Sequence, residues 1–123
     1  MPSQFAARID ELATAASEAA AEFEPPADPP DEERAMEFLR EGLGPTIVVY
    51  LDARTGGGSP VEFGTEEFRR LERTTNTWLD LYAACYGVDL DAEFTVRKAA
   101  ELLMETHNVK DVAQLLTDVP ARH

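Results

Sequence analysis

A run of three glycines follows the most strand-like segment of the chain, and glycine-rich loops in this position can bind phosphate groups. The segment reads TIVVYLD over residues 46–52, and the loop reads TGGGSP over residues 55–60. A phosphate-binding loop of the GxxxxGK(S/T) type needs a lysine and the start of a helix directly after its last glycine. Here a second strand-like segment follows instead, and the GxGxxG pattern of dinucleotide-binding loops is also absent. Because glycine adopts positive φ without strain, we predict that residues 55–60 form the turn of a β-hairpin.

Residue types that often act as nucleophiles, bases or metal ligands are scarce, apart from the carboxylates. The single cysteine, Cys85, falls on the apolar stripe of a predicted helix, which favours a buried structural thiol over a reactive thiolate. Of the two histidines, His107 lies at the end of a predicted helix, where an imidazolium interacts favourably with the helix dipole, and His123 is the last residue. No spacing of cysteine and histidine matches a metal site. We therefore predict no catalytic residue, no metal site and no cofactor.

Arginines gather around the predicted hairpin in an otherwise acidic chain, and they are candidates for binding an anion or a partner protein. The candidate contact residues are Arg54, Arg69, Arg73, Asn76 and Trp78. The alternative is that these arginines form structural ion pairs along a helix. Only Glu66 with Arg70 has the spacing and orientation that such pairs require, so structural pairing explains the cluster incompletely. Both interpretations remain open from the sequence.

The charge balance of the chain is strongly acidic. It has 24 Asp and Glu against 11 Lys and Arg, a formal net charge of -13, and the basic set contains nine arginines but only two lysines. Such a charge repels itself in dilute salt but is screened at molar salt, where the Debye length falls to about 3 Å. An acidic protein with one disordered acidic tail is the alternative. The acids are spread along the chain, with 11 in residues 1–41 and 13 in residues 42–123, which favours a halophilic protein.

The sequence predicts a soluble, cytoplasmic protein. A single cysteine excludes an internal disulfide and is typical of a reducing compartment. No apolar run approaches the roughly 20 residues needed to cross a bilayer, so we expect no membrane contact. The N-terminal segment has no basic region, and Glu18 and Glu22 interrupt its alanine-rich part, which disfavours a signal peptide.

Apolar residues at alternating steps of four and three predict an amphipathic helix over residues 3–23. This stripe comprises Phe5, Ile9, Leu12, Ala16, Ala19 and Phe23. Its alanine-rich second half implies a close helix neighbour, in the same chain or in a second copy, and makes the stripe a candidate surface for self-association. The proline-rich segment EPPADPP then predicts an extended linker. We thus divide the chain into an N-terminal helix (1–23), a linker (24–30) and a single globular α+β domain (31–123).

Within that domain, capping residues and periodicity predict the remaining elements. Asp31 is placed to cap a helix that we expect to stop at Gly42, and Pro45 separates this helix from the strand TIVVYLD. The strand pairs in our prediction with residues 61–63. Further helices are predicted over residues 66–86, 94–106 and 109–116, with Gly87 and Asn108 as caps. The predicted fold is α+β and mainly helical, with about five helices around one short β-hairpin.

The C-terminal segment FTVRKAAELLMETHNVKDVAQLL suggests a helix-turn-helix DNA-binding motif. If DVAQLL is the first helix of that motif, a recognition helix must follow, but only TDVPARH remains, and Pro120 lies where that helix would start. If residues 109–117 are themselves the recognition helix, their outward side chains make few phosphate contacts. The candidate DNA contacts are Arg97, Lys98, Lys110 and Gln114.

The segments WLDLYAACYG and FTVRKAAELLMETHNVKDVAQLL resemble the small uncharacterised acidic proteins of halophilic archaea. The resemblance covers much of the chain after the predicted hairpin. It implies a halophilic origin and no known activity, so no functional residue is carried over from it.

Taken together, these patterns favour a non-enzymatic protein-interaction or regulatory module. It would self-associate as a homodimer or bind a protein partner through the N-terminal helix or the apolar surface near Trp78. The alternative is a transcription-associated DNA-binding regulator that uses the C-terminal helices. An enzyme with a pocket near Arg54 and Arg73 is disfavoured because no catalytic set accompanies them.

Overall fold

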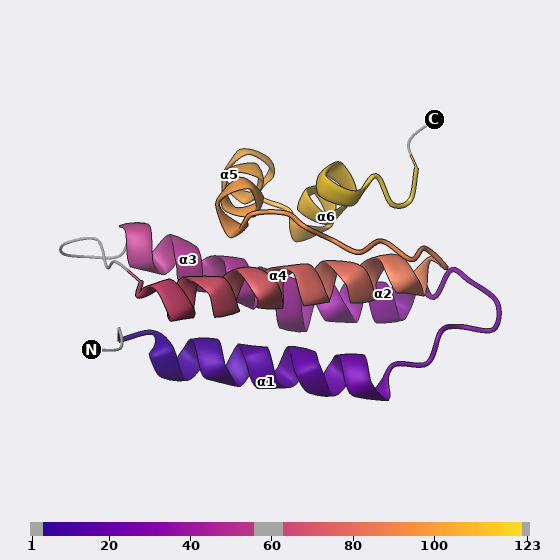
Figure 1. Cartoon of the computed structure of the whole chain (residues 1–123). Helices are drawn as coiled ribbons and strands as arrows, with labels where there is room; N and C mark the ends of the chain where they lie inside the picture. The colour runs from indigo at the N-terminus through magenta and orange to yellow at the C-terminus, as the bar shows by residue number, and fades with distance from the viewer. Residues whose placement is uncertain (1–3, 56–62, 122–123) are drawn as a thin grey trace.

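The described part of the chain, residues 4–55 and 63–121 of a computed structural model, is all-helical (Figure 1). Its elements are α1 (Ala6–Glu22), α2 (Glu32–Phe38), a π-helical turn η1 (Leu39–Leu43), α3 (Gly44–Thr55), α4 (Thr65–Cys85), α5 (Val96–Thr106) and α6 (Val109–Thr117). Because α2, η1 and α3 continue into one another, the described chain contains five helices in three layers. The layers are α1, then α4 beside the α2–η1–α3 helix, then α5 with α6 (Figure 1).

The predicted β-hairpin is wrong, because the described residues contain no strand and TIVVYLD lies inside α3. Its buried residues include Ile47, Val49, Tyr50 and Ala53, spread over a wide face that contacts α1 and α4 on one side and α5 on the other. A helix buried on two sides carries a continuous apolar run, and such a run cannot be distinguished from a buried strand by periodicity. The second predicted strand, residues 61–63, is described only at Phe63, which is not in a strand. The predicted turn lies outside the described residues from position 56 onward.

Gly42 does not stop the helix that Asp31 begins, and Pro45 does not separate it from the next element. Asp31 accepts a hydrogen bond from Arg34 N, as the predicted cap requires, but the helix then continues through η1 into α3. At Gly42 a Cβ atom would lie 2.3 Å from Trp78 Cδ2, so only glycine leaves space for the indole ring. The absence of a side chain at Gly42 thus allows α4 to pack closely, whereas the prediction assigned this glycine to the left-handed end of a helix.

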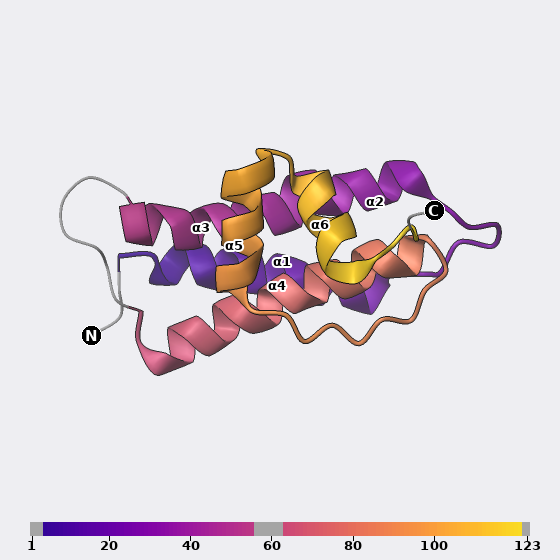
Figure 2. The same ribbon diagram turned by 90° about the horizontal axis from the view of Figure 1, so that it is seen from above.

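The apolar stripe of α1 packs inside the same chain. Ile9, Leu12 and Ala16 are buried where α1 lies against α4, with further contacts to α3 (Figures 1 and 2). The segment that follows α1 is held in place at both ends. Arg34 places its guanidinium 4.5 Å from the centre of the Phe23 ring and donates a hydrogen bond of 2.9 Å to a backbone oxygen of this segment. Asp31 N donates to Cys85 O at 2.8 Å.

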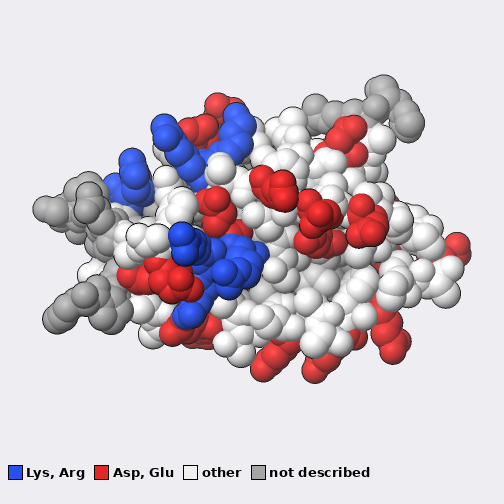
Figure 3. Space-filling model, in the orientation of Figure 1, with Lys and Arg blue, Asp and Glu red and all other residues white. Residues whose placement is uncertain are grey.

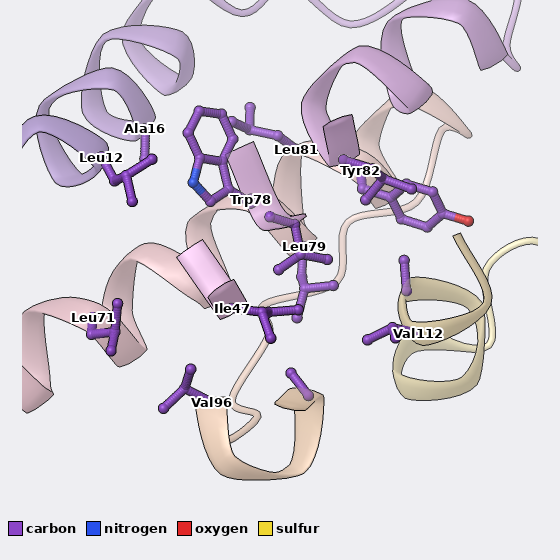
Figure 4. Packing of buried hydrophobic residues seen from close by; sticks show 14 of the residues in the cluster. Leu12, Ala16, Ile47, Leu71, Trp78, Leu79, Leu81, Tyr82, Val96 and Val112 are labelled. Carbon is purple, nitrogen blue, oxygen red and sulfur yellow. The ribbon is translucent and has the colours of Figure 1, made fainter. Parts of the chain in front are cut away.

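The third layer, α5 with α6, lies across the long helices and closes the other side of the core (Figure 2). The buried side chains Ile47, Leu79, Tyr82, Val96 and Val112 meet between the layers (Figure 4). Each of the last two helices buries one face only, which explains the clear amphipathic periodicity of their sequences.

The ends of the other four helices agree closely with the prediction. The expected helices at residues 3–23, 66–86, 94–106 and 109–116 are found as α1, α4, α5 and α6, with each end shifted by three residues or fewer. Gly87 follows α4 with φ of 80°, the left-handed conformation expected after a helix. The Asn108 side chain accepts hydrogen bonds from the N–H groups of Lys110 and Asp111, which confirms the predicted cap of α6.

Candidate functional site

The five residues predicted to bind an anion or partner have different roles in the structure. Arg54 lies 5.9 Å from the Tyr50 ring centre, and Arg69 and Arg73 are exposed on α4. Asn76 is a structural clamp, because its side chain donates to Phe94 O at 2.9 Å and accepts from Phe94 N at 2.8 Å.

Trp78, the fifth of these residues, is only 4% exposed, and its indole N–H has no acceptor among the described residues. Its ring lies on Gly42 and near Phe38. The indole therefore belongs to the core and offers no contact surface of its own.

A groove between α1 and α4 is lined by Arg73, one of the five predicted contact residues. It consists of two halves that meet at Thr77. The apolar half has a volume of about 750 Å³ and is lined by Ala20, Phe23, Pro25, Thr77, Asp80, Leu81, Ala84, Gly87, Val88, Asp89, Leu90 and Asp91. The arginine half has a volume of about 560 Å³ and is lined by Asp10, Ala13, Thr14, Ala16, Ser17, Glu18, Arg70, Arg73, Thr74 and Thr77. We call the whole feature the α1–α4 groove.

The apolar half has an acidic edge. Burial raises the pKa of Asp80; the hydrogen bond of 2.6 Å that its Oδ1 accepts from Ala92 N opposes this, and the carboxylates of Asp91 and Asp89 raise the pKa further. No Lys or Arg is among the described residues that line this half. The three carboxylates therefore produce a negative potential beside the apolar lining, and no Lys or Arg among the described lining residues neutralises it.

The arginine half carries positive charge on the side formed by α4, from Arg70 and Arg73. Arg70 forms an ion pair with Asp10 across the groove, which fixes α1 against α4. Arg73 is exposed and forms no ion pair within the described residues. The Thr77 hydroxyl donates to Arg73 O at 3.0 Å, so its hydroxyl hydrogen is used inside the helix.

The two halves give this face of the molecule an uneven charge distribution. In Figure 3 the Lys and Arg side chains gather on the left, over the first part of α4 and, above it, over α3 and α5, with some Asp and Glu beside them. Toward the other end of α4, the same face shows Asp and Glu around an uncharged area. Along one helix, then, a basic region is followed by an apolar and acidic region.

The residues with nucleophilic or ligating side chains are placed in structural positions. Cys85 is fully buried, and this burial raises the pKa of its thiol to about 11, so the thiol stays protonated at neutral pH. His107 ends α5 in the left-handed conformation, with φ of 54°. In the part of the chain that the structure describes, no three His, Cys, Asp or Glu side chains are grouped so that they can hold a metal ion.

The candidate DNA contacts lie on the α5–α6 layer. Arg97 pairs with Glu101 at 3.3 Å, and Lys98 and Lys110 are exposed. Gln114 donates from Nε2 to Pro120 O at 3.0 Å and thereby holds the segment after α6. Three of the four candidate side chains thus reach solvent, and the fourth has a structural bond.

The acidic edge of the groove was not predicted from the sequence. Asp89 and Asp91 are two of many acids, and nothing local distinguishes them. Their place beside Asp80 results from the α4–α5 connection, which runs back along α4 (Figure 2). Both residues line the same hollow as Ala20 and Phe23 at the end of α1. One signal was available: Asp80 follows Arg73 by seven residues, and that spacing puts both on one face of a helix.

Fold and groove together define a small all-helical domain with a charged and apolar surface groove. The chain belongs to the family DUF8055, a domain of unknown function, whose model matches residues 3–121. No curated protein and no solved structure matches the chain. Within the described residues, none of the helices combines the length and apolar character needed to cross a membrane.

Proposed function

We propose that this protein is a non-enzymatic protein-interaction module of a halophilic cytoplasm, and that it binds its partner through the α1–α4 groove. The observation that supports this proposal is the apolar half of the groove. Its lining contains Phe23, Leu81, Val88 and Leu90, and Val88 is 37% exposed. Apolar floors with polar edges are typical of protein contact sites.

The arrangement of α1 decides which surface is available. The stripe of Ile9, Leu12 and Ala16 is already buried against α4, so α1 contributes a wall of the groove and not a free helix. Ala20 of α1 and Phe23, which follows its last residue, line the apolar half, and Thr14, Ser17 and Glu18 of α1 line the arginine half. The groove follows α4 for several turns, and this elongated shape suits a helix or an extended segment of a protein.

The non-enzymatic part of the proposal rests on the placement of the reactive groups. Cys85 is buried with a raised pKa, and His107 ends a helix. Neither is among the residues lining the α1–α4 groove. A nucleophile without a base in reach is not activated for catalysis.

The halophilic part of the proposal rests on composition. A net charge of -13 and two lysines against nine arginines are typical of a chain that folds in molar salt. The resemblance to the small acidic proteins of halophilic archaea supports the same conclusion.

Affinity capture at molar potassium chloride, with and without nuclease, tests the proposed function. Deleting residues 1–30 is unsuitable, because it removes Ile9, Leu12 and Ala16 from the core and uncovers the face of α4 on which α1 packs. The better variant is Val88→Lys, which puts a charge into the apolar half at a residue that is 37% exposed. Its matched control is Leu115→Lys, at a residue of α6 that is 42% exposed. Loss of a nuclease-resistant partner with Val88→Lys alone supports the proposal, whereas equal recovery with both variants contradicts it.

The alternative is a DNA-binding regulator that uses α5 and α6. The exposure of Arg97, Lys98 and Lys110 on this layer supports it. Reversing the charge of Arg97 and Lys98 should then abolish binding to a recovered DNA site at native salt. Unchanged binding by this double variant would exclude the alternative.

A further inference from the structure

We propose that the partner of the α1–α4 groove is a second copy of this chain. The two copies would be related by a two-fold axis that passes near Thr77, with their α4 helices antiparallel. This inference rests on the proposed function and names the partner that the groove binds.

The first argument is that the groove is complementary to itself. Arg69 and Arg73 are exposed toward one end of α4, and neither forms an ion pair within the described residues. The apolar half, toward the other end, carries the uncompensated carboxylates of Asp80, Asp89 and Asp91. A surface that carries both members of a complementary pair meets the requirement of a two-fold interface, in which each copy presents the same patch.

The second argument is the spacing along α4. Arg73 and Asp80 are separated by seven residues, which is close to two helical turns and about 10 Å along the axis. The midpoint between them falls beside Thr77, the residue that both halves of the groove share. An axis at Thr77 therefore brings Arg73 of each copy opposite Asp80 of the other, and Arg69 toward the connection that carries Asp89.

The third argument concerns the residues at the centre of the groove. Ser17, Ala20, Thr77 and Ala84 have small side chains, so a second helix can approach closely there. The Thr77 hydroxyl already donates to Arg73 O. The approaching helix therefore does not leave this donor buried without a partner.

The net charge determines the salt dependence of this dimer. Two copies that each carry a net charge of -13 repel each other at long range in dilute salt. At molar salt this repulsion is screened beyond about 3 Å, whereas ion pairs in contact and apolar burial act at shorter range. Association should therefore be favoured at molar potassium chloride and weakened on dilution of the salt.

Sedimentation equilibrium of the purified chain at molar potassium chloride tests the proposal, with circular dichroism to confirm folding. Arg73→Glu and Asp89→Arg, both at exposed positions, should each raise the dimer dissociation constant about tenfold, because each alters two symmetry-related contacts. Arg69→Glu, at an exposed position that faces Asp89 in this dimer, should have the same effect. A mixture of Arg69→Glu with Asp89→Arg should dimerise like the wild type, since the introduced carboxylate of one chain then faces the introduced guanidinium of the other. The matched controls are Lys98→Glu and Glu105→Arg on α5, which make the same charge changes away from the groove and should leave the constant unchanged.

Two results would overturn the proposal. One is a wild-type chain that is monomeric at every concentration and salt; the other is an Arg73→Glu variant that dimerises as well as Lys98→Glu. If the chain is monomeric but Val88→Lys still abolishes capture of a partner, the proposed function stands and self-association is wrong. A dimer that withstands both groove substitutions would place the contact on another surface.

Discussion

The indole ring of Trp78 lies directly on the backbone of Gly42, where a Cβ atom would approach Cδ2 to 2.3 Å and Cε2 to 2.5 Å. This contact joins the middle of α4 to the π-helical turn η1, so α4 packs closely on the helix that precedes it. Both residues are buried. The position of α4, and with it one wall of the groove, thus depends on the absence of a side chain at residue 42.

Gly42→Ala should therefore destabilise the fold by about 2 kcal/mol, because a methyl group in a filled site forces the indole or the helix to move. This loss opposes the small gain that alanine normally brings to a helix. The free energy of unfolding, measured by denaturant titration at molar potassium chloride, gives the result. Gly64→Ala is the control, since its Cβ would lie 3.4 Å from the nearest side-chain atom. Equal stability of the two variants would show that α4 does not depend on this contact.

Asn76→Ala should cost about 2 kcal/mol of stability, because Phe94 then loses the partners of both its N–H and its C=O group. The substitution should also release the connection that carries Asp89 and Asp91. Thermal unfolding measures the first effect, and amide hydrogen exchange of residues 88–95 measures the second. Gln114→Ala, which removes one hydrogen bond to Pro120 O at the surface, is the control and should cost less. Unchanged exchange in residues 88–95 would contradict the clamp.

The thiol of Cys85 should resist alkylation in the native protein up to pH 9 and react at once after unfolding. Burial raises its pKa to about 11 from a usual value of 9.0, so the unfolded thiol ionises at a lower pH than the folded one. Stability should consequently fall as the pH rises from about 9 to about 11. Tyr82 and Tyr86 have raised pKa values as well, so the Cys85 contribution is isolated by comparing the wild type with Cys85→Ala. Rapid labelling of the native thiol at pH 8 would contradict this prediction.

The melting temperature should rise steeply between dilute and molar potassium chloride, because screening removes repulsion within a chain of net charge -13. Replacing the exposed acids Glu22, Glu37 and Glu105 by glutamine should raise the melting temperature in dilute salt and reduce this dependence. Calorimetric scans over a salt series measure both effects. If the melting temperature of the triple variant depends on salt as strongly as that of the wild type, charge repulsion does not cause the salt dependence.

The sequence alone predicted the parts of the fold that neighbouring residues determine. The cap at Asn108, the left-handed Gly87 and the stripe of Ile9, Leu12 and Ala16 all follow from local spacing, and the structure contains each of them. Two residues of the predicted contact set, Asn76 and Trp78, have structural roles that depend on Phe94 and Gly42. Those partners are distant in the sequence, and no local pattern identifies them.

Composition therefore determined the net charge, and helical periodicity determined most helix boundaries, because those boundaries depend on residues within a few turns of each other. Tertiary structure alone decided that TIVVYLD is a helix, because only contacts with α1, α4 and α5 cover it on two sides. It also decided that Arg73 and Asp80 line two hollows that share Thr77. The seven-residue spacing in the sequence already places both residues on one face of a helix. The wall beside this face is α1, which packs on α4 through its buried apolar stripe. That stripe lies more than 50 residues earlier in the chain, so no local pattern predicts the contact.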